Sequence, residues 1–458
     1  MANYRVQNPA TGEVVETFEP ATDTQVAEIL QSSEAAYLAW RKKSVQERAA
    51  AIKRAAELFA ERRQELAETI TLEMGKSIPE ALDEVDFATD IIDYYAVHGP
   101  SLITEGEIPS TVPGKAVIQR LPIGPLLGVM PWNFPYYQVA RFAAPNLLLG
   151  NTVIVKHADI CARSAQLMED IFLEAGVIEG GYHNIYASHD QIAKIIADPI
   201  TQGVSLTGSE RAGAIIAEQA GKNLKKCVLE LGGNDPMIVL ADVDVTEVAK
   251  AAWDFRTYNL GQVCNSNKRI IVEDGIYDAF VAELVKHAAG LRPGDPRDLK
   301  PGEYGPMSSR AAAETVAEQV DRAVAVGARV LSGGELTAGS AAYYSPTVLV
   351  DVPRDSGIFH EEIFGPVVTV YRAADADDAL ALANDSAYGL GGSVFSRDVA
   401  LATELAQQLN VGMAHVNTIA AEAAELPFGG VKRSGFGREM GPIGIDEFVN
   451  KRLFFVAP

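Results

Sequence analysis

Short apolar segments rich in β-branched residues alternate with helical segments through most of this chain. Residues 152–156 (TVIVK), 203–206 (GVSL) and 268–272 (KRIIV) have the character of buried strands, while 164–175 and 276–290 have helical spacing. Strands that alternate with helices of about 10–15 residues predict parallel sheets with helices packed on their faces. We therefore expect an α/β fold, and the length of 458 residues favours two or three domains.

The first quarter of the chain has a different pattern. Residues 5–20 predict short strands around a turn, and residues from about 23 to 100 predict helices. Ser44 is expected to cap a long helix in which apolar residues from Ile52 to Ile70 recur at three- and four-residue spacing. These positions predict a core-facing stripe and carry no chemistry.

Composition excludes several classes of partner and site. The net charge of −22 argues against nucleic-acid and anionic-membrane partners. The longest apolar runs are too short to span a bilayer, and no targeting segment is visible in MANYRVQNPATGE. Three cysteines without a paired framework indicate a reduced, cytoplasmic protein. The seven scattered histidines show no ligand spacing, so no metal site is expected.

Cys264 lies where a reactive side chain is expected. It follows Gly261 and Gln262 in a short polar loop, directly before an apolar strand at 268–272. Loops held by a rigid strand commonly carry catalytic groups. Glu230 lies upstream in a second loop, within LELGG. The sequence therefore predicts that Cys264 is a nucleophile.

Two other segments suggest binding chemistry. Residues 207–213 (TGSERAG) place a hydroxyl and glycines at a strand-to-helix turn, where backbone N–H groups favour a phosphate. The segment is not a GxGxxG fingerprint, so an ordinary strand-to-helix turn is an equal alternative. Asn133 is bracketed by Pro131 and Pro135, which fix the backbone around one polar side chain. Taken alone, it is also compatible with a simple turn asparagine.

Seven motifs occur in order along the chain. They are PWNFP (131–135), TVIVK (152–156), TGS (207–209), LELGG (229–233), GQVC (261–264), EEIFGP (361–366) and PFGGVKRSG (427–435). Together they resemble the aldehyde dehydrogenase superfamily over roughly residues 5–458. The resemblance implies an α/β fold with two doubly wound lobes and a small β oligomerisation extension.

The resemblance also implies a division of the chain. An NAD(P)-binding lobe takes residues 1–103 and 122–232, and a catalytic lobe takes 233–440. The oligomerisation extension takes 104–121 and 441–458, and an exposed apolar C-terminal strand there would favour a homodimer or homotetramer.

The resemblance assigns catalytic roles to three residues. Cys264 is implied as the nucleophile that attacks an aldehyde carbonyl. Asn133, with the backbone N–H of Cys264, is implied to stabilise the resulting oxyanion. Glu230 is implied as the general base that activates the water for thioester hydrolysis. Cys161 and Cys227 match no catalytic position and are expected to be small buried residues, with a resting disulfide or a redox role as the alternative.

The resemblance implies a dinucleotide site as well. Its implied cofactor-binding residues are Trp132, Lys156, Asp159, Thr207, Gly208, Ser209, Gly232, Glu362 and Phe364. Lys156 and Asp159 would approach the adenosine ribose, Ser209 the pyrophosphate, and Glu362 the nicotinamide ribose. A carboxylate accepts hydrogen bonds from the 2′-hydroxyl of NAD but repels the 2′-phosphate of NADP. Asp159 therefore predicts NAD as the preferred cofactor, with NADP possible.

Within the superfamily the sequence is most similar to the succinate-semialdehyde dehydrogenase branch. In that branch an arginine at the position of Arg141 recognises the distal carboxylate of the substrate. The alternative is a helix arginine paired with an acidic neighbour. Glu422 stands where the branch commonly has serine, and a carboxylate there would disfavour a dicarboxylate-like substrate. Tyr137 and Phe428 are further candidates for the substrate pocket.

Several alternatives stay open at this stage. Glu422 would favour a cationic aminoaldehyde, and the aromatic residues Tyr136, Trp253 and Tyr258 are compatible with an aromatic or aliphatic aldehyde. A CoA-acylating dehydrogenase is a second class, although Glu230 serves hydrolysis. An inactive structural relative is a third class, which the retention of the catalytic residues disfavours.

Overall fold

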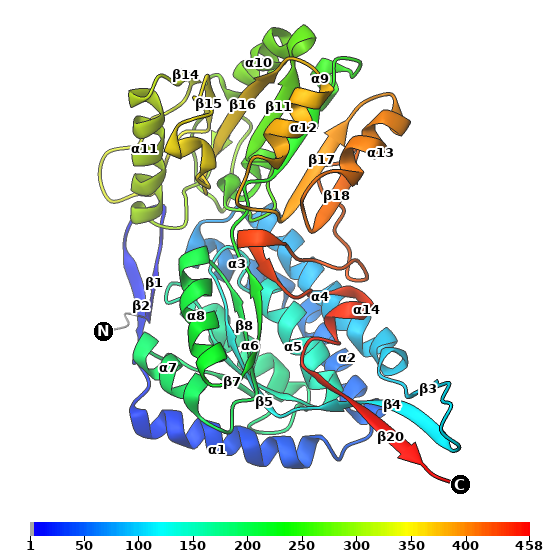
Figure 1. Cartoon of the computed structure of the whole chain (residues 1–458). Coiled ribbons are helices and arrows are strands. Elements are labelled where there is room, and N and C mark those ends of the chain that lie inside the picture. Colours follow the sequence, from blue (N-terminus) through cyan, green and yellow to red (C-terminus); the bar gives the residue numbers. More distant parts are fainter. Residues whose placement is uncertain (1–3) are drawn as a thin grey trace.

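A computed structural model describes residues 4–458 and consists of two α/β lobes and a smaller β extension (Figure 1). Residues 1–3, which the predicted cofactor lobe includes, lie outside the described residues. In Figure 1 the lobe built on residues 236–416 lies above the one built on residues 125–230, and the extension projects from the lower lobe. The fold therefore has the predicted α/β architecture.

The lower lobe contains a six-stranded sheet with the order β19-β9-β8-β5-β6-β7. All its pairings are parallel except β19 with β9. Its strands are β5 (Pro125–Val129), β6 (Thr152–Lys156), β7 (Tyr182–Asn184), β8 (Gly203–Thr207), β9 (Lys226–Glu230) and β19 (Gly435–Phe436). Because helices cover both faces, strands such as β6 and β8 are buried along their whole length and need continuous apolar sequence.

The helices of this lobe are α1 (Asp23–Trp40), α2 (Val45–Glu61), α3 (Arg63–Met74), α4 (Ile78–Leu102), α5 (Tyr137–Leu149), α6 (Ala162–Glu174), α7 (His189–Ala197) and α8 (Glu210–Lys222). Ser44 caps α2 in a capping box with Glu47, as the sequence predicts. The single long helix predicted after Ser44 is wrong in one respect, because the helix breaks at Arg62, where φ is −100°. Both halves still bury the predicted apolar stripe, since Ile52 and Ile70 are fully buried.

The upper lobe contains a seven-stranded sheet with the order β14-β15-β16-β11-β10-β17-β18. Its strands are β10 (Pro236–Val239), β11 (Arg269–Glu273), β14 (Arg329–Ser332), β15 (Thr347–Val350), β16 (Val367–Ala373), β17 (Gly391–Phe395) and β18 (Met413–Val416), and only β14 is antiparallel to its neighbour. The helices are α9 (Val245–Thr257), α10 (Asp274–Ala288), α11 (Arg310–Ala325), α12 (Ala376–Asn384) and α13 (Val399–Gln407). The loop that carries Cys264 connects α9 to β11 in this lobe.

The extension is a three-stranded antiparallel sheet. It joins β3 (Gly106–Ile108), β4 (Lys115–Pro122) and β20 (Val449–Val456) in the order β20-β4-β3. A separate hairpin of β1 (Tyr4–Gln7) and β2 (Val14–Phe18) begins the described chain. Among residues 4–458, no helix combines the length and the apolar character that crossing a bilayer demands.

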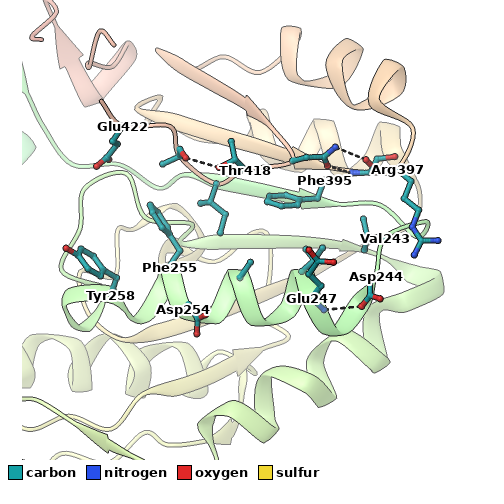
Figure 2. A pocket seen from close by; sticks show the side chains of 16 residues that line it. Val243, Asp244, Glu247, Asp254, Phe255, Tyr258, Phe395, Arg397, Thr418 and Glu422 are labelled. Atoms are coloured by element: carbon teal, nitrogen blue, oxygen red, sulfur yellow. Dashed lines mark hydrogen bonds between the residues drawn. The ribbon is translucent and has the colours of Figure 1, made fainter. Parts of the chain in front are cut away.

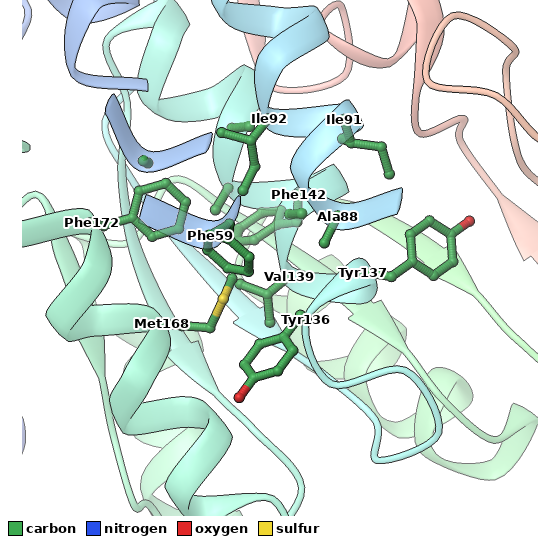
Figure 3. Close-up of a cluster of buried hydrophobic side chains, with 14 of the residues drawn as sticks. Phe59, Ala88, Ile91, Ile92, Tyr136, Tyr137, Val139, Phe142, Met168 and Phe172 are labelled. Carbon is green, nitrogen blue, oxygen red and sulfur yellow. The ribbon is translucent and has the colours of Figure 1, made fainter. Parts of the chain in front are cut away.

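The largest hydrophobic core lies where α5 packs between α2, α4 and α6 (Figure 3). Phe59, Phe142 and Met168 meet there, and the ring of Tyr136 packs edge-on against Phe59 at 5.8 Å. Burying each such side chain contributes roughly 1.5–3 kcal/mol. The core forms a rigid base beneath residues 131–135, and it places Tyr136 away from any substrate pocket.

Candidate active site

Arg256 fixes the loop that carries Cys264. This buried side chain at the end of α9 donates hydrogen bonds to the carbonyl of Gly261 at 3.0 Å and to Ser266 Oγ at 3.1 Å. It also donates to the carbonyls of Ile363 at 2.8 Å and Val367 at 2.9 Å. Burial without a carboxylate partner lowers the pKa of Arg256 to about 9. One guanidinium therefore ties the GQVC loop to the EEIFGP segment.

Asn133 lies against the same loop. Its Nδ2 donates a hydrogen bond to the carbonyl of Gln262 at 3.0 Å. Its own carbonyl accepts hydrogen bonds from Lys76 Nζ at 2.9 Å and from Asn259 Nδ2 at 3.1 Å. These hydrogen bonds join the PWNFP turn to the GQVC loop, although the two segments lie far apart in the sequence. They hold the Asn133 amide against Gln262, which stands two residues before Cys264 in the chain.

Glu230 ends β9 and is buried, and no described residue makes a hydrogen bond to either of its carboxylate oxygens. Gly429 packs directly against it, since a Cβ atom there would lie 2.7 Å from Glu230 Oε1. Burial raises the pKa of Glu230 well above its ordinary value, and the positive charge of Arg141 opposes this rise. A buried carboxylate left without a partner is suited to bind and activate a water molecule.

Arg141 in α5 is fully buried and engaged by protein groups. It forms an ion pair with Glu439, and it donates hydrogen bonds to the hydroxyls of Tyr137 at 3.0 Å and Thr207 at 3.2 Å. Its guanidinium also lies 4.7 Å from the centre of the Phe428 ring. The acidic partner that the sequence left as an alternative is therefore present in the fold. The charge of Arg141 also opposes the rise in the pKa of both Glu230 and Cys264 that burial causes.

Four aromatic side chains from three segments of the chain pack against one another. The ring of Tyr137 meets Phe428 at 6.5 Å and Phe134 at 5.8 Å, and Phe134 stacks with Tyr258 at 6.3 Å. Tyr258 lines an open cavity of about 910 Å³ between α9 and the segment after β18 (Figure 2). The structure therefore groups Tyr137, Phe428 and Tyr258, whereas Trp253 stacks on His287 at 6.2 Å.

Glu422 lines the same cavity (Figure 2) and accepts a hydrogen bond from Asn265 Nδ2 at 2.6 Å. Asn265 directly follows Cys264, so Glu422 approaches the catalytic loop instead of pointing into bulk water. Glu422 is exposed toward the cavity, and desolvation by the surrounding protein raises its pKa, while the hydrogen bond from Asn265 and the charge of Arg141 oppose the rise.

The residues expected to hold the adenosine end lie at the carboxyl ends of parallel strands. Lys156 ends β6, and its Nζ pairs with Asp159 Oδ1 at 2.7 Å. Ser209 caps α8, with its Oγ accepting a hydrogen bond from Ala212 N at 3.3 Å. In open α/β sheets this edge is where a dinucleotide fits. The side chain of Thr207 instead accepts its hydrogen bond from Arg141, so only its backbone faces this edge.

A second group of predicted residues gathers around Glu362. Its Oε1 accepts a hydrogen bond from Gly233 N at 3.1 Å and lies 3.1 Å from Lys268 Nζ. A Cβ atom at Gly232 would collide with Glu362 Oε2, so a larger residue there would displace the end of this carboxylate side chain. The rings of Trp132 and Phe364 meet edge to face at 5.7 Å. These residues fit a nicotinamide ribose and ring, because they combine an acceptor, a close backbone cradle and aromatic walls.

The "Aldehyde dehydrogenase family" profile matches residues 2–453. The chain belongs to the aldehyde dehydrogenase family. It is an oxidoreductase that acts on aldehydes, and its α/β lobes are those of this family. The resemblance drawn from seven sequence motifs is confirmed.

Named relatives cover nearly the whole chain. The chain is 49% identical over 456 residues to a succinate-semialdehyde dehydrogenase [NADP(+)] of Deinococcus radiodurans, covering 99% of this chain and 95% of the relative. It is 43% identical over 443 residues to succinate semialdehyde dehydrogenase [NAD(P)+] Sad of Escherichia coli, covering 97% and 96%. A solved succinic semialdehyde dehydrogenase of Streptococcus pyogenes in complex with NADP+ superposes with a TM-score of 0.96 at 41% identity, covering 99% and 100%.

Sequence reasoning missed three buried residues of this aldehyde dehydrogenase site. Glu439 pairs with Arg141, Lys268 pairs with Glu362, and Arg256 pins the loop. Glu439 lies in a stretch whose glycines predicted only a loop. The available signal was a charged residue within an apolar or glycine-rich stretch. This signal does not identify the partner of the charge, because the partner is distant in sequence.

Proposed function

We propose that this enzyme oxidises succinate semialdehyde to succinate with NAD(P) as the electron acceptor. The observation that carries the chemistry is the hydrogen bond from Asn133 to Gln262, which joins the PWNFP turn to the Cys264 loop, together with the partnerless buried carboxylate of Glu230. The names of the relatives at 49% and 43% identity support the substrate.

In this proposal Cys264 Sγ forms a bond to the aldehyde carbon. Asn133 Nδ2 and the backbone N–H of Cys264 donate hydrogen bonds to the oxyanion, and removing one such donor typically costs on the order of 100-fold or more in rate. When bound, NAD(P) would supply the acceptor for the hydride that leaves the former aldehyde carbon, and collapse of the oxyanion then leaves a thioester on Cys264 Sγ. Glu230 then takes a proton from water, whose oxygen attacks the Cys264 thioester and releases the acid and the free thiol.

The proposed cofactor site extends from Asp159 to Glu362. Lys156 and Asp159 face the adenosine ribose, Ser209 at the start of α8 faces the pyrophosphate, and Glu362 faces the nicotinamide ribose. We infer a preference for NAD because the carboxylate of Asp159, which is part-exposed at the end of β6, repels a 2′-phosphate. The Deinococcus radiodurans relative is named for NADP(+). We therefore expect this chain to differ from that relative in its cofactor preference.

The substrate end of the pocket contains opposing charges. Arg141 favours a distal carboxylate, but Glu439 already neutralises part of its charge. Glu422 disfavours a carboxylate when ionised, and its raised pKa reduces that repulsion. A cationic aminoaldehyde is the second candidate substrate, because Glu422 is hydrogen-bonded to the residue next to Cys264.

An aldehyde panel tests the proposal. Purified enzyme is mixed with NAD or NADP and with succinate semialdehyde, an aminoaldehyde, benzaldehyde or an aliphatic aldehyde, and NAD(P)H absorbance is followed. We expect the highest kcat/KM for succinate semialdehyde, without CoA. Glu422→Ser should raise this value several-fold and lower the value for the aminoaldehyde, since it removes a carboxylate from the pocket.

Two variants serve as controls. Cys264→Ser should lose at least about 10³-fold in kcat while still binding cofactor, because it removes the nucleophile. Cys227→Ser, which changes a half-buried cysteine on β9, should keep the wild-type rate. A higher kcat/KM for any other aldehyde, or a requirement for CoA, contradicts the proposed reaction.

We also propose the domain division, the assembly and the location. The cofactor lobe takes residues 1–103 and 122–232, the catalytic lobe 233–440, and the extension 104–121 with 441–458. The extension supports a homodimer or homotetramer, because β20 exposes apolar side chains along its length. Three free cysteines support a reducing cytoplasmic location.

A further inference from the structure

Lys268 lies four residues after Cys264 and directly before β11, and its side chain is only 1% exposed. Its Nζ donates hydrogen bonds to the carbonyls of Val263 at 2.8 Å and Cys264 at 2.5 Å. The same ammonium lies 3.1 Å from Glu362 Oε1. An ammonium group has three donors, and all three have a partner here. Lys268 therefore joins the backbone of the nucleophile to the carboxylate of Glu362.

The surroundings of this lysine are tightly packed. A Cβ atom at Gly233 would lie 2.6 Å from the Cys264 carbonyl oxygen and 2.7 Å from Asp235 Oδ1, so Asp235 belongs to the same cluster. Burial raises the pKa of Asp235 to about 8, with the charge of Lys268 working against the rise. Glu362, whose Oε1 lies 3.1 Å from the ammonium, is the carboxylate that forms an ion pair with Lys268.

We propose that Lys268 is a positioning residue for the nucleophile: its ammonium group fixes the Cys264 backbone to Glu362 and supplies positive charge beside the thiol. The inference rests on the proposed roles of Cys264 and Glu362. In this role Lys268 connects Glu362, on the cofactor side of the site, to Cys264, which carries the reactive sulfur.

The charges around Cys264 support this role. Arg141 and Tyr137 approach from α5, Glu422 from the segment after β18, and Asp235 and Lys268 from the segments around β10 and β11. Burial raises the pKa of the Cys264 thiol to about 12, while Arg141 and Lys268 work against this rise. Arg141 and Lys268 are the two cations in that set that oppose the rise in the Cys264 pKa. Arg141 is itself paired with Glu439.

The experiment measures alkylation of Cys264 by iodoacetamide as a function of pH, in the full-length enzyme without cofactor or aldehyde. Mass spectrometry of the Cys264 peptide separates it from Cys161 and Cys227. In Lys268→Met we expect the pH midpoint to rise by about one unit or more, since removing a nearby opposite charge raises the pKa of a thiol. Lys268→Arg should keep the midpoint close to that of wild type.

Glu362→Gln provides a test in the opposite direction. It removes the carboxylate that balances Lys268, so the midpoint should fall. Lys250→Met, which removes an exposed lysine of α9 paired with Asp254, is the matched control and should leave the profile unchanged. A loss of folding alone would not shift these midpoints in opposite directions.

A wild-type profile in folded Lys268→Met overturns the proposal. If Lys268→Met does not fold, as judged by circular dichroism, Glu362→Gln decides, and an unchanged midpoint in that variant overturns it as well. Because the assay contains no aldehyde, its result is separate from the substrate assignment. A wild-type enzyme that oxidises no aldehyde would defeat the proposed function while leaving the shift in midpoint intact.

Discussion

Asp159 and Lys156 form an ion pair of 2.7 Å at the carboxyl end of β6, where we expect the adenosine ribose. Two like charges about 4 Å apart repel by roughly 1–4 kcal/mol near a protein surface. We therefore expect a higher kcat/KM with NAD than with NADP, and we expect Asp159→Ser to raise the NADP-to-NAD ratio at least about 10-fold. Initial rates at saturating aldehyde measure the ratio.

Asp159→Asn separates charge from size, because it keeps the shape and removes the repulsion. Asp190→Ser, at an exposed position in the first turn of α7, should leave the ratio unchanged. A wild-type preference for NADP would show that Asp159 does not face the 2′ position.

Single residues of the site differ in how far the sequence predicts them. Cys264, Glu230 and Asn133 stand in motifs that the sequence alone shows, and we propose that all three take part in catalysis. The engagement of Arg141 by Glu439 and Thr207 could not be predicted, since it depends on segments that meet only in the folded chain. Charge pairs of this kind leave no local pattern in sequence.

The elements around the PWNFP turn are joined by a buried ion pair. Lys76, just before α4, pairs with Glu84 in α4, and both side chains have no exposed surface. Lys76 also donates to the carbonyl of Asn133 at 2.9 Å, and Glu84 Oε1 accepts from the backbone N–H of Tyr136 at 2.9 Å. The start of α4 therefore fixes both the turn and the first residues before α5.

We expect Lys76→Met to destabilise the protein by about 3–5 kcal/mol, because it leaves the Glu84 carboxylate buried and unpaired. Urea unfolding measures the loss. Lys76→Met with Glu84→Gln should recover part of the stability but not the wild-type kcat, since Asn133 loses its support in both variants. Lys53→Met breaks the exposed pair with Asp93 and should cost no more than about 1 kcal/mol. An equal cost in the two single variants would contradict a special role for the buried pair.

Periodicity predicted most elements but not their junctions. The alternation of strands and helices gave the class of fold because a buried parallel strand needs continuous apolar sequence. The break between α2 and α3 at Arg62 was missed, because both halves keep the same buried face across it. Hydrophobic spacing reports which face is buried and is insensitive to a short interruption.

At the scale of the whole molecule, the connections between distant segments were the least predictable feature. The two-residue strand β19, from within residues 233–440, pairs with β9 of the lower sheet and places Gly435 beside Glu230. A strand of this length has no sequence signature of its own. Glu230, the proposed base, is therefore held partly by a late segment of the chain, which only the folded structure reveals.

The extension sheet makes the assembly of the molecule testable. Strand β20 pairs with β4 on one side, and Leu453 and Phe454 are 59% and 46% exposed in the described chain. An apolar edge strand is a liability that pairing with the sheet of a second copy removes, so we expect a homodimer or homotetramer. Light scattering after size-exclusion chromatography at micromolar concentration should give at least twice the mass of one chain.

Leu453→Lys with Phe454→Lys should shift the enzyme toward the mass of one chain, because lysines on an edge strand oppose strand pairing. Val324→Lys with Val326→Lys, at exposed apolar positions at the end of α11, is the matched control and should leave the mass unchanged. Circular dichroism should be the same for both double variants, since none of these side chains is buried in the described chain. A wild-type enzyme with the mass of one chain would contradict the predicted assembly and would mean that the exposed strand serves another purpose. Equal loss of assembly in both double variants would mean that added charge, and not the position of β20 at the sheet edge, controls association.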